Sequence, residues 1–163
     1  MRLNILKKQL LTAGVLLLLT AFVGIIGIIN LGSVNGLGTS MYADRTVPIE
    51  QLGKVNAALV NEQRLGLRGI LFAGDAKTQA QIDADMAGYE AEVKEKIDAY
   101  AATSLLDSEK VALADFRTLY AEYQGLRDQV RQLSRDGKAD EAKAANKPAL
   151  ATYLKVNDTV ETL

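Results

Sequence analysis

The sequence predicts an all-α protein: a membrane-anchored antiparallel up-down-up-down four-helix bundle. Three observations predict this class. A long uncharged apolar run lies near the N-terminus, the remainder repeats apolar residues at steps of three and four, and no stretch alternates as a strand does. The 163 residues are enough for one domain of ordinary size.

The apolar run comprises residues 10–31, which contain no charged residue. It is long enough to cross the ~30 Å hydrocarbon core of a bilayer as a helix. A cleaved signal peptide is the alternative, but its apolar region is usually only about 7–15 residues long and ends in a small-x-small cleavage site. This run is longer and its exit offers no good Ala-x-Ala match, which favours an uncleaved anchor.

The charges around this run predict its orientation. Three basic residues precede it: Arg2, Lys7 and Lys8. The first charge after it is Asp44. The positive-inside rule therefore predicts a cytoplasmic tail at 1–9, a transmembrane helix at 10–31 and an extracytoplasmic domain at 32–163.

Four helical segments are expected after the anchor. The first spans about 41–73 and ends at Gly74, a typical C-terminal glycine. The second spans about 77–101, and the fourth starts near residue 139. Short turns between helices of this length require antiparallel neighbours. The first helix has the apolar stripe Ile49, Leu52, Val55, Leu59, Ile70 and Ala73.

The third segment has the most regular pattern, with steps of three and four that are typical of a helix packed nearly parallel to its neighbours. Its apolar stripe is Phe116, Leu119, Tyr123, Leu126, Val130 and Leu133. Gly137 is the expected C-terminal glycine of this helix. Pro148 lies inside the fourth pattern, where we expect it to kink or break the helix.

Four local motifs occur in the order and spacing of a known family. They are "MYADRTVPIEQL", "EQRLGLRGILFAGD", "SLLDSEKVALADF" and "SRDGKADEAKA". Together with the basic tail and anchor, they resemble the four-helix bundle sensor domain of bacterial methyl-accepting chemotaxis proteins. One departure is Asp107-Ser108, where relatives often have Thr-Pro; both pairs are suited to cap a helix.

The resemblance implies an extracytoplasmic ligand sensor that works as a homodimer, with its domain in the periplasm and its anchor in the bacterial inner membrane. It also implies cytoplasmic signalling partners. The last helical pattern stops at Leu163 without a cap, so we expect the chain to continue into a second membrane crossing and an output module.

Arg64 and Arg68 stand four residues apart on one face of the first helix, and neither has an acidic residue three or four positions away. One interpretation is that they reach acids on another helix or extend into water. The other is an anion site, in which two guanidinium groups offer bidentate hydrogen bonds to a ligand carboxylate. The resemblance supports the anion site, because receptors of this family hold ligand carboxylates with arginines on helix 1.

Two residues of the fourth helix are expected at the same height as these arginines. Asn146 and Tyr153 recur on one face there, and an amide and a phenol suit the orientation of a small polar molecule. Core packing is an equal alternative for Tyr153. The predicted ligand-binding residues are therefore Arg64, Arg68, Asn146 and Tyr153.

The composition excludes several other functions. Without cysteine or histidine there is no thiol chemistry, no disulfide, no histidine-based triad and almost no transition-metal site. No phosphate-binding loop is present. All 20 acidic residues lie at Asp44 or later, so the extracytoplasmic part offers no basic surface to nucleic acid. We therefore expect no enzyme activity, no catalytic residue, no cofactor and no metal.

The predicted function is the sensory module of a transmembrane chemoreceptor, which binds a small carboxylate-bearing ligand and transmits a helix shift across the membrane. Two alternatives stay open. The same bundle also serves as the input domain of sensor kinases and cyclic-nucleotide enzymes, and a ligand-free membrane-anchored dimerisation stalk would have the same pattern.

Overall fold

The computed structural model describes residues 5–42 and 46–163, and in these ranges helices are the only regular secondary structure. The chain divides into two compact units, Met1–Arg45 and Thr46–Leu163, which are described separately. Arg2 of the predicted cytoplasmic tail lies outside the described residues.

The first unit contains helix α1, Ile5–Met41. Within it, Lys7–Gly36 is long and apolar enough to cross a membrane, with a mean hydropathy of 2.5. The hydroxyls of Thr12, Thr20 and Ser33 each donate a hydrogen bond to the carbonyl four residues earlier. These bonds satisfy the polar side chains within the helix, as an apolar surrounding requires.

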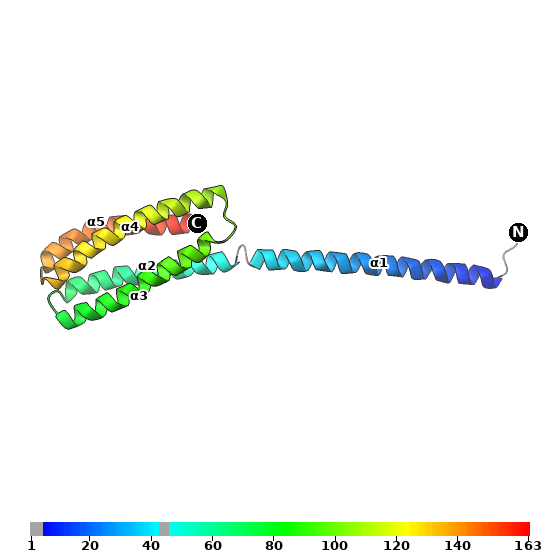
Figure 1. Cartoon of the computed structure of the whole chain (residues 1–163), viewed down its shortest axis with the longest axis horizontal. Helices are drawn as coiled ribbons and strands as arrows, with labels where there is room; N and C mark the ends of the chain where they lie inside the picture. Colours follow the sequence, from blue (N-terminus) through cyan, green and yellow to red (C-terminus); the bar gives the residue numbers. More distant parts are fainter. Residues whose placement is uncertain (1–4, 43–45) are drawn as a thin grey trace. The chain divides into compact units, whose positions relative to one another are not determined.

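The second unit is a bundle of four helices joined by short turns (Figure 1). The helices are α2, Val47–Leu71; α3, Ala76–Ala101; α4, Asp107–Arg135; and α5, Ala139–Thr162. The predicted all-α four-helix bundle is confirmed.

Three local expectations need correction. Helix α2 begins at Val47 and not near Met41, with a proline in its first turn. Leu106 is the N-cap of α4 in place of Asp107, and its N–H donates to the Glu109 carboxylate over 2.7 Å. Pro148 does not break α5, which continues through it as one helix to Thr162.

The helices pack as two hairpins. Helix α2 has its main contacts with α3, and α4 has its main contacts with α5. Helix α2 also contacts α4 and α5, whereas α3 and α5 are not in contact in the described bundle. Helices α3 and α4 follow one another in the chain but share few contacts.

The core confirms most of the predicted apolar stripes and corrects two of them. Val55, Leu59, Phe116, Tyr123 and Val130 are buried as predicted. Ile49 is 70% exposed, because it lies in the first turn of α2. In α4 the predicted leucines are only half-buried. Between the buried Tyr123 and Val130, the buried position is occupied by a charged residue, Arg127. The half-buried leucines are Leu119, Leu126 and Leu133.

The α2–α3 and α4–α5 turns meet at the end of the bundle opposite its two chain ends. The N–H of Gly74 donates to the Ser134 carbonyl over 2.8 Å. Gly74 and Gly137 have φ of 84° and 74°, the left-handed region that other residues avoid. A Cβ on Gly74 would lie 3.3 Å from the Gly137 Cα. The two predicted C-terminal glycines therefore also permit the close approach of the two hairpins.

Candidate sensory site

Arg64 and Arg68 lie on successive turns of α2, and both side chains are exposed. Within the described residues neither forms an ion pair. Most other arginines of the bundle are paired with acids, for example Arg117 with Asp98 over 3.5 Å. Two unpaired guanidinium groups one turn apart are thus the feature that distinguishes this face of α2.

Tyr153 of α5 lies close enough to α2 to be affected by one of these arginines. Burial raises the pKa of the Tyr153 phenol, and the charge of Arg64 opposes that rise. The Tyr153 ring also packs against Tyr123, with the ring centroids 5.8 Å apart. Tyr153 therefore packs against the core, which was one of its two interpretations, and also lies near Arg64; its role as a ligand-binding residue stays a prediction.

Asn146 lies on α5, two helical turns from Tyr153 towards the end with the two turns, and is half-buried. No hydrogen bond joins Asn146 or Arg68 to Arg64 or Tyr153 in the described structure. The structure thus brings Arg64 and Tyr153 into electrostatic range, and it places Arg68 and Asn146 on the same two helices without direct polar contact.

Exposed apolar side chains flank the arginines. Leu67 and Leu71 of α2 are 46% and 81% exposed, and Leu150 and Leu154 of α5 are 40% and 53% exposed. Large apolar side chains on two adjacent helices are unusual on a solvent-facing surface and are typical of an interaction face. Helices α2 and α5 therefore both expose apolar area, and α2 exposes its two unpaired arginines beside it.

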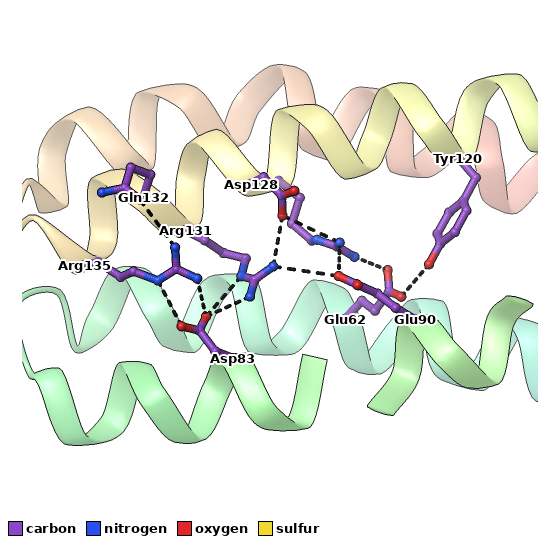
Figure 2. Close-up of polar contacts among 9 residues, drawn as sticks. Glu62, Asp83, Glu90, Tyr120, Asp128, Arg131, Gln132 and Arg135 are labelled. Atoms are coloured by element: carbon purple, nitrogen blue, oxygen red, sulfur yellow. Dashed lines mark hydrogen bonds and ion pairs between the residues drawn. The ribbon is translucent and has the colours of Figure 1, made fainter. Parts of the chain in front are cut away.

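A second polar cluster lies inside the bundle and was not predicted. Arg127 of α4 is 3% exposed, and its Nη1 donates to the carboxylate of Glu62 of α2 over 2.6 Å. Its Nη2 donates to the carboxylate of Glu90 of α3. The Tyr120 hydroxyl donates to the other Glu62 oxygen over 2.8 Å (Figure 2). Glu62 itself is 0% exposed.

The electrostatics of this cluster reflect its burial. Burial raises the pKa of the Glu62 carboxyl, and the Arg127 charge and the Tyr120 hydrogen bond only partly oppose it. Burial and the charge of Glu62 also raise the pKa of the Tyr120 phenol. For Arg127, burial acts to lower the pKa, but the charges of Glu62 and Glu90 outweigh it, so its pKa is raised.

The ionic contacts continue along α4 towards the two turns (Figure 2). Arg131 and Arg135 both donate to the Asp83 carboxylate of α3, over 2.8 and 2.7 Å. Arg131 also pairs with Asp128 over 2.9 Å. Burial acts to raise the pKa of Asp83, but the hydrogen bonds from Arg135 and Arg131 outweigh it, so this pKa is lowered.

A pattern in the sequence could have indicated the buried pair. Glu62 continues the apolar stripe of α2, three residues after the buried Leu59. Arg127 stands four residues after Tyr123 and three before Val130, both buried. A charged residue on the apolar stripe of each of two packed helices predicts a buried ion pair, since neither can reach water.

The groove between α3 and α4 contains a cavity of about 460 Å³. Ala87 and Ala91 of α3 and Ala121 of α4 leave it open because their side chains are small. None of the four predicted ligand-binding residues lines it. Among the described residues, no group of three or more Asp or Glu side chains is arranged to hold a metal ion.

Comparison with known families agrees with this architecture. Residues 2–163 match a family described as the four helix bundle sensory module for signal transduction. The chain belongs to this family. The resemblance to the sensor domain of methyl-accepting chemotaxis proteins is thereby confirmed over nearly the whole chain. Searches of curated proteins and of solved structures each found no match.

Proposed function

We propose that this sensory module binds a small carboxylate-bearing ligand through Arg64 and Arg68 of α2, with Asn146 and Tyr153 of α5 as partners. The observation that carries the proposal is the pair of exposed guanidinium groups without an ion pair in the described structure. A carboxylate would supply the acceptors that these donors lack, in the bidentate geometry that arginine favours.

The electrostatic link between Arg64 and Tyr153 gives this site a way to transmit occupancy. A ligand held by residues of both helices changes the free energy of α5 relative to α2, and packed helices respond with small slides or rotations. The chain runs from α2 back to α1, the apolar helix. A shift of α2 against α5 would thus be passed to the membrane and on to a cytoplasmic signalling partner.

In this proposal α1 is an uncleaved anchor in the inner membrane of a bacterium, with residues 1–9 in the cytoplasm and 32–163 in the periplasm. The length and hydropathy of Lys7–Gly36 support a membrane span. Alkaline phosphatase fused after residue 40 should be active in cells. Inactivity there, together with activity of a cytoplasmic reporter at the same position, would reverse the topology.

A homodimer is the second part of the proposal. The exposed leucines of α2 and α5 support association through the face that carries the arginines. The full chain in detergent should sediment as a dimer, and Leu71→Lys should shift it towards monomer. A dimer unaffected by that change would move the interface elsewhere.

The ligand is tested by a thermal-shift screen of the full chain against small organic acids and amino acids. A ligand raises the melting temperature by mass action. Arg64→Ala or Arg68→Ala should weaken its binding by about 1.5–3 kcal/mol, the scale of a hydrogen bond to a charged group, without unfolding the bundle. Arg117→Ala, an exposed arginine of α4, is the matched control and should retain affinity.

The alternative of a ligand-free stalk makes the opposite prediction. Alanine at either position would then lower the stability of the bundle, and no acid would shift its melting. Variants that fold normally and bind a found ligand at full affinity would end the arginine hypothesis. The input domain of a sensor kinase or cyclic-nucleotide enzyme would give the same binding result with a different cytoplasmic partner.

A further inference from the structure

The buried cluster has an unequal charge count at its centre. Two carboxylates, Glu62 and Glu90, share the guanidinium of Arg127, and Glu90 also pairs with Arg131 over 3.7 Å. The Glu62 side chain is 0% exposed and that of Glu90 is 31% exposed. We call these three residues the triad. The ionic contacts that continue from the triad add two more guanidiniums, Arg131 and Arg135, and two more carboxylates, Asp83 and Asp128. With all of these groups ionised, four carboxylates face three guanidiniums, an excess of one negative charge, and Glu62 is the most deeply buried of the four acids.

The surroundings of Glu62 offer little else to balance that charge. From α4 it faces Arg127 and the Tyr120 hydroxyl, and from α3 it faces the like charge of Glu90. The neighbouring Tyr123 hydroxyl donates to Gln63 over 3.4 Å, and α5 contributes Tyr153, which packs on Tyr123. These are neutral phenols, so Arg127 is the one cation among these contacts.

We propose that the triad binds one proton when the external pH falls, so that the bundle senses acidity in addition to any carboxylate ligand. The proton is taken up on Glu62, the more deeply buried acid. The three guanidiniums are then matched by the three remaining carboxylates, so the net charge of these ionic contacts is zero. Removing a buried uncompensated charge is the driving force.

The directions of the pKa shifts agree with this geometry. Burial raises the pKa of Glu62, and the charge of Glu90 raises it further. The pKa of Asp83, which has two arginines, is lowered instead. Because the folded chain holds the Glu62 proton more tightly than the unfolded chain, this group's contribution to stability increases as the pH falls through the folded pKa.

Proton uptake would change which helices are joined. With Glu62 ionised, Arg127 ties α4 to both α2 and α3. With Glu62 neutral, Arg127 keeps its ion pair with Glu90, which joins α4 to α3, two helices with few other contacts. The ion pair that joins α4 to α2 is lost. Transmission of this change to a signal depends on the proposed function, because α2 is the helix that follows α1. The proton binding itself does not depend on it.

The test uses the full chain in detergent micelles with ¹³C-labelled glutamate carboxyls, followed by NMR between about pH 4 and 8. One carboxyl should titrate above the ordinary glutamate pKa of about 4.3. Its signal should be missing in Glu62→Gln and present in Glu50→Gln, an exposed glutamate on the same helix. A Glu62 signal that titrates at or below the ordinary value would overturn the proposal.

A second variant, Glu90→Gln, separates charge sharing from burial alone. It removes the like charge that shares Arg127 with Glu62, so the midpoint of Glu62 should fall by about one pH unit. An unchanged midpoint would refute the shared proton. This variant also identifies the Glu62 signal if Glu62→Gln does not fold. Binding of an acid at Arg64 and Arg68 is measured separately, so either proposal can fail without the other.

Discussion

Replacement of Arg127 by methionine tests the energetics of the buried cluster. The change removes the cation that serves both Glu62 and Glu90 and that lies 5.4 Å from the centre of the Tyr123 ring. Glu62, 0% exposed, then retains only the Tyr120 hydroxyl. Removing one partner of a buried pair costs about 3–5 kcal/mol, a large part of the roughly 5–15 kcal/mol that stabilises a typical domain.

The double variant Glu62→Met with Arg127→Met should recover much of this loss, because it removes both buried charges and leaves only the partly exposed Glu90. The free energy of unfolding is measured by urea titration of residues 46–163 at pH 7, with helicity as the signal. Arg117→Met, an exposed arginine on α4 with a weak ion pair, is the control and should cost less than about 1 kcal/mol. If Arg127→Met also costs less than about 1 kcal/mol, or if the double variant is no more stable than the single one, Arg127 does not compensate a buried charge on Glu62.

Three further predictions concern the turns and the pH dependence. Gly74→Ala or Gly137→Ala should destabilise the bundle by about 1–2 kcal/mol because both glycines have a left-handed φ. Gly88→Ala, in the interior of α3 with open space around it, should instead stabilise the bundle by about 0.5–1 kcal/mol. Equal effects of the two kinds of change on thermal unfolding would contradict this. Asp83→Asn should be less stable than the wild type at pH 7. Since the folded pKa of Asp83 is lowered, its contribution to stability is present above its unfolded pKa of about 3.9 and is lost as the pH falls through the folded pKa. The unfolding free energies of the two proteins should therefore converge in acid. A difference that stays constant with pH would show that Asp83 acts by packing.

The fold could be predicted because each helix of the bundle has an apolar stripe and ends in turn residues with a clear preference. Gly74 and Gly137 mark two helix ends, and both adopt the positive φ expected of them. The start of α2 was placed too early, although Thr46 and Pro48 are a capping residue and a first-turn proline that are typical of a helix start. The stripe of α4 was assigned to its leucines because a charged residue is not counted as core.

The buried cluster departs from the rule that charged side chains lie on the surface, and in the sequence only the positions of Glu62 and Arg127 on apolar stripes indicate it. Its formation depends on three helices that are distant in sequence, so Glu62 finds Arg127 only after the two hairpins pack. For Arg64 and Arg68, the absence of an acid along their own helix could be read from the sequence. The absence of an ion pair to another helix could only be observed once α5 and α4 were placed around α2.

The location of a bound acid by amide NMR is the most direct test of ligand binding at Arg64 and Arg68. The full chain in micelles is titrated with the acid that raises its melting temperature most, and shift changes are mapped onto the bundle. We expect the largest changes around Arg64 and Arg68 of α2 and around Asn146 and Tyr153 of α5. Changes concentrated in the groove between α3 and α4, around Glu90 and Arg117, would contradict the proposed site.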